Sequence, residues 1–412
     1  MKKILTAFLI ATLSLSTLFS LNEVEASTNY KDVPTKHWAY NTIQEATKLG
    51  YFKGDGKGNF NPKANVTRAE FAQILARLFD GTDRTKEPFT DVADTFWGKD
   101  AIEEMLALGI INANDYANKR FEPNKAMTRT ELSKWLTNAL SVEQPTYTTI
   151  AKTIRDSEHT LLPVTEYLKG GISKAEQGYI GVTLGTGLFG GYTDGSFKPK
   201  GNTSRAEVAT LAIRFRNMQD KAPTEFNGLN EIVEVSETAT NMLAATKFEY
   251  ANYQGEHTVK SIVNKPLTLN NNIGTFKIKR LIFIEGNKTV KETLNNSIYA
   301  KMFIDENNEL NNEFIYENSV HMYVDQTLVP NKKIENGLTI GSGSTNGFVV
   351  PFRLADNVSK YNLATLQDYS TFFKVGKETR YWTQTSYIKK SDFNYGSYKV
   401  DDGTVLRFYS TY

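Results

Sequence analysis

The stretch Thr67-Arg68-Ala69-Glu70 returns twice further along the chain, as Thr128-Arg129-Thr130-Glu131 and as Ser204-Arg205-Ala206-Glu207. In each copy a hydroxyl residue stands three positions before a Glu, and an apolar run follows. This pattern is typical of a capping box, in which the hydroxyl oxygen accepts from the backbone N–H of the Glu and the Glu carboxylate accepts from the N–H of the cap. We therefore predict that three helices begin here.

The Arg in this phrase is unexpected, because the first turn of a helix carries the positive end of the helix dipole and favours Asp or Glu. A guanidinium beside free backbone N–H groups is, however, well suited to a carboxylate or phosphate held by two parallel hydrogen bonds. We predict that Arg68, Arg129 and Arg205 bind an anionic ligand at three equivalent places. The alternatives are three solvated surface arginines or three internal salt bridges.

A longer repeat surrounds each copy of the phrase and keeps one spacing. Each copy has a Pro six residues before its Arg, a Phe two residues before that Pro, and a Gly-rich turn upstream. One repeat is therefore predicted to be a helix, a turn, a short extended piece and a second helix. Because two short amphipathic helices cannot bury their apolar faces alone, we expect the three second helices to share a core. The repeated members are Phe60-Asn61-Pro62, Phe121-Glu122-Pro123 and Phe197-Lys198-Pro199, with Leu49-Gly50, Leu108-Gly109 and Thr186-Gly187 before them.

Copies one and two also share a start, in which an Asp-Val pair precedes a Trp and the first helix. Copy three keeps the apolar Ile180 of that helix, but its Trp position holds Ala175 and its lead-in is longer. Taken together, these residues resemble the S-layer homology (SLH) module in three tandem copies. The residues that carry the resemblance are Asp32-Val33, His37-Trp38-Ala39, Asp91-Val92, Trp97, the Gly, Phe and Pro frame, and the three Arg phrases.

The resemblance implies modules at 29–86, 87–148 and 152–220, arranged as a mostly α-helical, three-pronged pseudo-trimer with a central helical core. In that family the grooves between the prongs bind secondary cell-wall polysaccharide, typically through pyruvate-ketal sugars, and fix a protein to a Gram-positive cell wall. The ligand-contacting Arg of the family falls on Arg68, Arg129 and Arg205. A pyruvylated polysaccharide presents a carboxylate, which is the kind of anion that the charge argument predicts.

Two Trp residues are further candidates for polysaccharide binding. Trp38 and Trp97 stand at the start of the first helix in copies one and two, where each could stack on a sugar ring, although a Trp there often belongs to the core. In copy three, Ala175 replaces the Trp and Ser204 replaces the capping Thr. We therefore expect the groove that uses copy three to be weakened or purely structural.

The composition limits the classes of partner. The 412 residues carry a formal net charge of +2, so no broad electrostatic attraction to nucleic acid or anionic lipid is expected. Residues 1–26 are typical of a secretory signal peptide, with Lys2 and Lys3 before an apolar stretch and a small-x-small site at Val24-Glu25-Ala26. No other segment has the length of a membrane span, and the chain contains no Cys. We expect a secreted cell-wall protein that is not inserted in the membrane after signal cleavage.

After a short linker at 221–224 the periodicity changes to two, which is typical of β-strands. A change of parity at Lys279-Arg280 predicts a β-bulge, and Pro351 predicts an edge strand. We predict that 227–246 is a helix or an irregular connection and that 225–412 forms an all-β sandwich, for which the immunoglobulin-like fold is one candidate. The runs expected to be strands are 276–283, 298–303, 320–324, 348–354, 380–383 and 405–409.

The region 225–412 carries no catalytic motif: it has no zinc-type His spacing, no G-x-S-x-G turn and no phosphate-binding loop. The acidic stretches 305–309 and 401–403 lack the alternating ligands of a calcium loop, so we interpret them as solvated turns. We predict no metal, no cofactor and no enzymatic activity, but a displayed domain with S-layer neighbours or another partner. The alternatives are an anchored wall-modifying enzyme, whose paired carboxylates leave no sequence pattern, and a ligand-binding surface protein.

Overall fold

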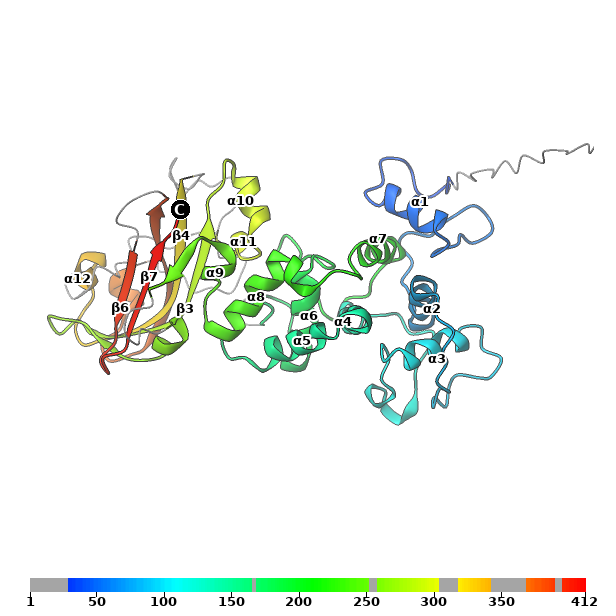
Figure 1. The fold of residues 1–412 in the computed structure, drawn as a ribbon, viewed down its shortest axis with the longest axis horizontal. Coiled ribbons are helices and arrows are strands. Elements are labelled where there is room, and N and C mark those ends of the chain that lie inside the picture. The colour runs from blue at the N-terminus through cyan, green and yellow to red at the C-terminus, as the bar shows by residue number, and fades with distance from the viewer. Residues whose placement is uncertain (1–28, 165–167, 252–257, 304–317, 342–367, 390–394) are drawn as a thin grey trace, which may run out of the picture.

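The computed structural model describes residues 29–164, 168–251, 258–303, 318–341, 368–389 and 395–412. Helices form the N-terminal part, and antiparallel sheets form the C-terminal part together with several helices, so the prediction that 225–412 is all-β was wrong in that respect. Figure 1 shows the two parts at opposite ends of an elongated molecule, with α8 between them. The predicted signal peptide and the predicted strand at 348–354, with Pro351, lie outside the described residues, as does the acidic stretch 305–309.

The three copies of the repeat account for the helices of the N-terminal part, with one extra helix, α5, between copies two and three. Their bounds are α1 Tyr40–Lys48, α2 Arg68–Phe79, α3 Lys99–Ala107, η1 Ala113–Asp115, η2 Ala117–Lys119, α4 Arg129–Glu143, α5 Thr146–Asp156, α6 Lys174–Gly185 and α7 Arg205–Arg216.

The second helix of each copy begins where the repeated phrase predicts. Thr67, Thr128 and Ser204 are the N-caps of α2, α4 and α7, and each makes the full capping box with the Glu three residues later. The hydroxyl thus satisfies the N–H of the Glu, and the carboxylate satisfies the N–H of the cap. The capping residues are Thr67 with Glu70, Thr128 with Glu131, and Ser204 with Glu207.

The repeated Gly has a backbone reason. Gly50, Gly109 and Gly187 have φ of +77°, +70° and +77° and directly follow the last turn of α1, α3 and α6. A helix commonly ends on a left-handed residue, and only Gly adopts that conformation without the steric cost of a Cβ. The Gly therefore turns the chain from the first helix into the extended piece.

The three copies close into a ring. The first helix of each later copy packs against the second helix of the copy before it, α3 on α2 and α6 on α4, and α1 packs on α7. The second helices meet at their aromatic side chains: the ring centroids of Phe71 and Trp135 lie 5.9 Å apart, as do those of Phe79 and Phe215. The second helices therefore share a core.

The C-terminal part contains two antiparallel sheets, with strand orders β1-β7-β6 and β2-β3-β4-β5. Side chains of both sheets belong to one buried cluster; for example, the rings of Phe283 and Phe408 lie 5.6 Å apart, edge to face. The immunoglobulin-like topology stays a prediction. The bounds are η3 Pro223–Glu225, α8 Asn227–Thr238, α9 Met242–Ala245, β1 Phe248–Tyr250, η4 Val259–Ile262, β2 Leu267–Thr268, β3 Gly274–Glu285, α10 Val290–Asn296, α11 Ala300–Phe303, β4 Ser319–Pro330, α12 Gly337–Gly341, α13 Tyr369–Phe372, β5 Thr379–Ile388, β6 Tyr395–Lys399 and β7 Val405–Ser410.

The strand predictions have mixed outcomes. The runs at 276–283, 320–324, 380–383 and 405–409 lie in β3, β4, β5 and β7, and the register of β3 against β4 shifts between Ile278 and Arg280, which confirms the bulge. The prediction of a strand at 298–303 was wrong, because α11 occupies Ala300–Phe303. The buried residues Met302 and Phe303 follow the buried Tyr299 by three and four positions, which is a helical spacing. In a run of only six residues, this spacing cannot be told apart from the alternation of a strand.

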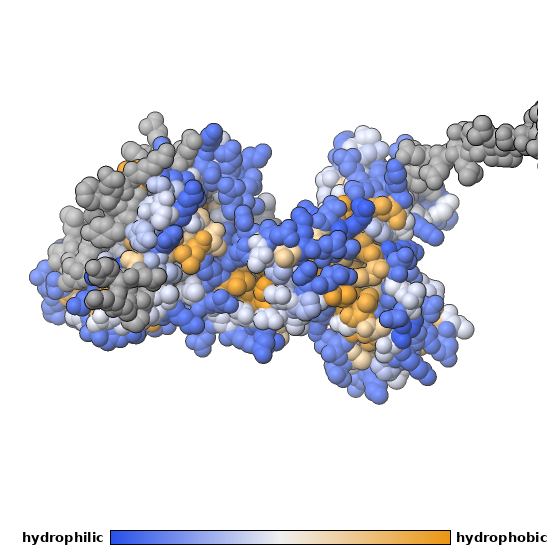
Figure 2. Space-filling model, viewed as in Figure 1, coloured by the Kyte–Doolittle hydropathy of each residue, from blue (hydrophilic) through white to orange (hydrophobic). Residues whose placement is uncertain are grey.

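The two parts meet over a continuous apolar core. Side chains of α8 join the cluster of the helical repeats to one face of the four-stranded sheet. The proposed boundary at residue 225 thus stays a prediction, with a shared core on both sides of it. Figure 2 shows a mostly hydrophilic surface, with apolar surface over the helical ring and near this junction. The joining residues are Leu229, Ile232, Val235, Ile282, Ile284, Tyr323 and Trp382.

Candidate functional site

Each Arg of the repeated phrase lies at a contact between two copies. The backbone N–H groups of Arg68, Arg129 and Arg205 donate to the carbonyl oxygens of Lys125 (3.0 Å), Gly201 (2.9 Å) and Ala64 (2.8 Å). These carbonyls come from the turn after the repeated Pro in copy two, copy three and copy one, in that order. Each second helix therefore starts on the loop of another copy, and the three contacts complete the ring.

The guanidinium groups continue this contact. Arg129 donates from Nε to the carbonyl of Phe197 (2.8 Å) and from Nη2 to that of Gly190 (2.7 Å). Arg205 makes the equivalent bonds, from Nε to the carbonyl of Phe60 and from Nη2 to that of Lys53, both at 2.9 Å. The loop carbonyls therefore hold one edge of the guanidinium and fix its direction.

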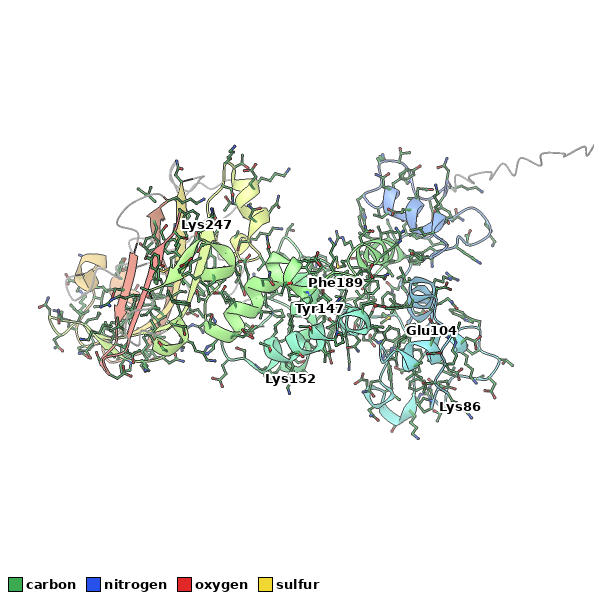
Figure 3. All side chains as sticks on the ribbon, viewed as in Figure 1. Lys86, Glu104, Tyr147, Lys152, Phe189 and Lys247 are labelled. Carbon is green, nitrogen blue, oxygen red and sulfur yellow. The ribbon has the colours of Figure 1, made fainter. Side chains whose placement is uncertain are left out.

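Aromatic rings of the same loops lie under the guanidinium groups. The Cζ of Arg129 is 4.4 Å from the ring centroid of Phe189 and 4.6 Å from that of Phe197, and the Cζ of Arg205 is 4.8 Å from that of Phe60. Burial lowers the pKa of both guanidinium groups from its ordinary value, but a guanidinium remains charged at any physiological pH. Figure 3 places Phe189 near the middle of the molecule.

Arg68 has a different environment. Its Nη1 donates to the carbonyl of Phe121 (2.7 Å) and to the carboxylate of Glu122 (3.1 Å), and its Nε and Nη2 both donate to Glu131. Burial acts to raise the pKa of Glu131, but the bonds from Thr128 and Arg68 outweigh it, so this pKa is lowered. Arg68 thus forms the internal salt bridge that was the alternative to anion binding.

Arg205 faces an open groove of about 790 Å³. Its side chain is 16% exposed, and the nearest carboxylate, of Glu70, lies 3.9 Å from Nη1. Lys53 and Lys63 also line the groove, and in the described part of the chain no ion pair or side-chain hydrogen bond engages their ammonium groups. The groove also contains Asp32, Asp55 and Glu70, whose carboxylates accept hydrogen bonds from the chain around them.

The sequence did not predict the role of the early Asp. Asp32 accepts from the N–H of Phe60 (2.8 Å) and of Asn61 (2.7 Å), and so holds the loop whose Phe60 carbonyl binds Arg205. Asp91 makes the same pair of bonds to Phe121 (2.8 Å) and Glu122 (2.9 Å) in copy two. Their shared place before each Trp was the signal that could have identified them.

Copy three uses the backbone for the same purpose. The N–H of Phe197 donates to the carbonyl of Lys169 (3.0 Å), within a parallel bridge that pairs Lys169 with Ser196. No carboxylate is needed, because the longer lead-in brings an extended segment beside the loop. This explains how copy three keeps the loop without an Asp at this place.

The two Trp side chains are outside the core. Trp38 is 66% exposed and Trp97 is 58% exposed, although each directly precedes a buried helix face. A Cβ on Gly98 would lie 3.3 Å from that of Ala69, so Trp97 neighbours the start of α2, where Arg68 lies. The residues that line the 790 Å³ groove do not include Trp38. Both indoles remain accessible to a ligand, and their contact with one stays a prediction.

The ring changes which residues belong together. From the sequence we expect Ala175 and Ser204 to share one weakened groove, but α6, which begins just before Ala175, packs on α4, the helix of Arg129. Ser204 instead caps α7 beside Arg205 and makes a complete capping box. The position without a Trp therefore belongs with Arg129, and the groove at Arg205 is formed with copy one.

Comparison with known families agrees with this repeat architecture. The S-layer homology domain model matches residues 29–72, 88–132 and 170–209. The chain contains three SLH domains. Each match ends just after the repeated Arg phrase.

Several curated proteins are similar over longer ranges. Cell surface glycoprotein 1 of Acetivibrio thermocellus is 28% identical over 187 residues, which are 44% of this chain and 8% of that protein. S-layer protein sap of Bacillus anthracis is 24% identical over 280 residues, 67% of this chain and 30% of that protein. The S-layer protein of Bacillus thuringiensis subsp. finitimus is 24% identical over 343 residues, 79% of this chain and 38% of that protein.

The chain therefore spans less than two fifths of the length of these relatives. The SLH domains and the surface proteins among the relatives assign it to the cell surface. Among the described residues, no helix combines the length and the apolar character that a membrane crossing requires.

Proposed function

We propose that the three SLH domains hold this protein on a Gram-positive cell wall by binding an anionic secondary cell-wall polysaccharide, and that Arg205 is the main anion-binding residue. The observation that carries the proposal is the guanidinium of Arg205, fixed by two carbonyls and open to a groove with Lys53 and Lys63. A pyruvate ketal on a sugar carries a carboxylate, which is the kind of anion that a guanidinium binds. Binding it costs little reorganisation, because the loop already orients the guanidinium.

The three sites differ in their readiness for such a ligand. Arg129 is held by carbonyls as Arg205 is, but it is only 5% exposed. Arg68 already pairs with Glu122 and Glu131, so a ligand carboxylate would have to displace an internal one. We therefore rank the sites Arg205, Arg129 and Arg68 in order of decreasing contribution.

The C-terminal β part is the displayed part in this proposal. Its partners are S-layer neighbours or another surface ligand, and the names of the relatives, which include two S-layer proteins, support the first. The pseudo-trimer of the family is consistent with the ring of contacts among α1, α2, α3, α4, α6 and α7.

The experiment is sedimentation of the mature protein with purified cell-wall sacculi, before and after removal of the wall polysaccharide. Loss of one charge-assisted hydrogen-bonded contact is worth about 1.5–3 kcal/mol, so Arg205→Ala should weaken binding by roughly 10- to 100-fold. Arg205→Lys should lie between, because it keeps the charge but loses the planar fork. The matched control is Arg216→Ala, which removes a charge from the other end of α7, where the arginine lies 3.9 Å from Glu45.

Two results would contradict the proposal. One is undiminished binding to sacculi stripped of polysaccharide. The other is equal loss of binding for the Arg205 and Arg216 variants, which would mean that only overall charge matters.

A further inference from the structure

The helix α8 joins the SLH part to the β part and carries a buried acid at the junction. It packs on α5 and α6 of the SLH part on one side and on α9 and η4 on the other. The side chain of Glu231 points into this junction, and the residue is 1% exposed. A carboxyl group in such a place needs an explanation, because an unpaired buried charge is costly.

Three donors from the β part converge on this carboxyl group. Ser297 donates from its hydroxyl (2.6 Å), Asn241 from its side-chain amide (2.8 Å), and Ile298 from its backbone N–H (3.3 Å). Asn241 in turn pairs with the backbone of Phe283 in β3, donating to its carbonyl (2.9 Å) and accepting from its N–H (2.7 Å). One side chain of α8 thus connects to β3 and to the turn between α10 and α11.

The charged neighbours of Glu231 do not neutralise it. On the same helix, Glu234 accepts from the N–H groups that start α9, and Glu237 is exposed. From the sheet side, the guanidinium of Arg280 is already bound to Asp325, and the buried hydroxyl of Tyr299 is neutral. Among the described residues no cation pairs with Glu231.

The protonation of these acids follows from burial. Burial raises the pKa of Glu231 to about 7, against the three hydrogen bonds that it accepts, and burial also raises the pKa of Glu234 to about 7. We call the state in which α8 packs on the β part closed, and the state in which this contact is broken open. In the open state Glu231 meets water, where the ordinary pKa of a Glu side chain is near 4.5. An acid with a raised pKa in the closed state stabilises that state at low pH, and this stabilisation is lost as pH rises from the open-state value to the closed-state value.

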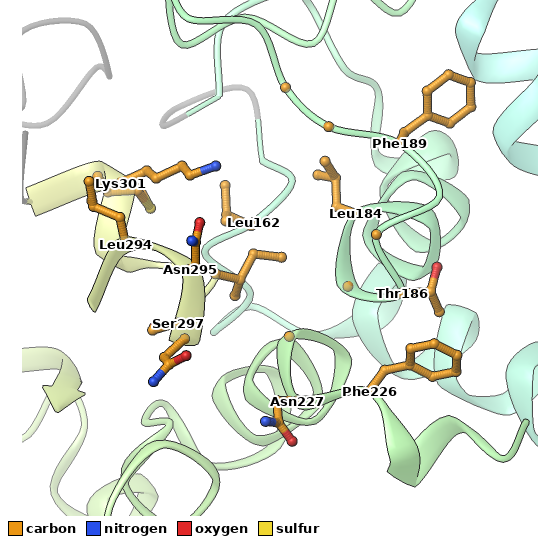
Figure 4. Close-up of a pocket in the computed structure, with 18 of the residues that line it drawn as sticks. Leu162, Leu184, Thr186, Phe189, Phe226, Asn227, Leu294, Asn295, Ser297 and Lys301 are labelled. Atoms are coloured by element: carbon orange, nitrogen blue, oxygen red, sulfur yellow. The ribbon is translucent and has the colours of Figure 1, made fainter. Parts of the chain in front are cut away.

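We propose that Glu231 makes the contact between the SLH part and the β part dependent on pH: the neutral carboxyl group closes α8 onto the β part, and its ionisation loosens that contact. A cavity of about 580 Å³ reaches the same place and is lined by Ser297, Ile298 and Lys301 (Figure 4). Water can enter through it when the hydrogen bond from Ser297 to Glu231 breaks. The inference is independent of polysaccharide binding.

The test is hydrogen exchange of backbone amides in the full chain between pH 5 and pH 8, corrected for the intrinsic rates. The amides of Phe283 and Ile298 report on the contact, because their N–H groups donate to Asn241 and to Glu231. With a pKa of about 7 closed and 4.5 open, Glu231 alone should lower the closing equilibrium by about 70-fold over this range. Glu231→Gln, which mimics the neutral acid, should remove this contribution and leave only that of Glu234, and Glu237→Gln is the matched control on the exposed face.

The proposal is overturned if protection of these amides in the wild type is the same at pH 5 and pH 8, or if Glu231→Gln leaves the dependence as steep. It is also overturned if the Glu237 variant flattens the dependence equally. Should the Glu231 variant fail to fold, the carboxyl group can be titrated directly by carbon NMR in the wild type, where a pKa below about 5.5 would refute the reasoning.

Discussion

Replacing Asp32 should damage both the fold and the binding groove. Asp32→Ala removes the acceptor for the N–H groups of Phe60 and Asn61. Hydrogen bonds to a charged group are worth about 1.5–3 kcal/mol each. Phe60 is fully buried and its N–H loses its partner, whereas Asn61 is exposed and water can replace the carboxylate there. The expected loss is therefore about 2–4 kcal/mol of unfolding free energy, less than the sum of the two bonds.

The assay is differential scanning calorimetry of the full chain. For a cooperative unit of roughly 200 residues, each kcal/mol lowers Tm by about 2–4 °C, so a fall of roughly 4–16 °C is expected. Asp91→Ala should give a similar fall, because it accepts the same two bonds in copy two. Asp83→Ala is the control, since Asp83 is exposed. A Tm change below about 2 °C for Asp32→Ala would refute the assigned role.

Other predictions concern packing and buried charge. Gly178→Ala should lower the free energy of unfolding, measured in urea, by about 3 kcal/mol or more, because its Cβ would lie 2.1 Å from the carbonyl oxygen of Ala151. Gly190→Ala, where the added Cβ meets open space, should change that free energy by less than about 0.5 kcal/mol. Asp325→Ala should lower the free energy of unfolding by about 3–5 kcal/mol. The guanidinium groups of Arg280 and Arg380 would both lose the fully buried carboxylate that they share. A loss under about 1 kcal/mol would mean that water replaces the carboxylate.

The local features of the fold could be predicted from the sequence. The capping boxes at Thr67, Thr128 and Ser204 depend on residues three apart, and so they are visible in the chain itself. The bulge near Arg280 is visible for the same reason, as a change of alternation. The helix α5 was not predicted, although Tyr147 and Ile154 are buried at a helical spacing, because it lies outside the frame of residues that the three copies share.

The partners of the site residues could not be predicted in this way. Arg205 is held by carbonyls of Phe60 and Lys53, which are 145 and 152 positions away in the chain. Backbone carbonyls have no residue identity, so no sequence pattern marks them as ligands. Likewise, nothing in the repeated phrase separates Arg68, which pairs with Glu131, from the other two. The motif located the arginines, and the ring of copies decides which partners each of them has.

The departures of copy three are explained by its position in the molecule. Copy three has an extra helix, α5, before it and a longer lead-in. Both meet the C-terminal part: α5 packs on α8, and Arg280 of β3 donates to the carbonyl of His159 in the lead-in (2.6 Å). The lead-in also supplies the Lys169 carbonyl that replaces the carboxylate of the other copies. The same segment thus supports the loop of copy three and binds the β part. Among the described residues, α1, α2 and α3 of copies one and two make no comparable contact with α8 or the sheet, and Trp38 and Trp97 are exposed. In the proposed function, these exposed faces are the ones available to the wall.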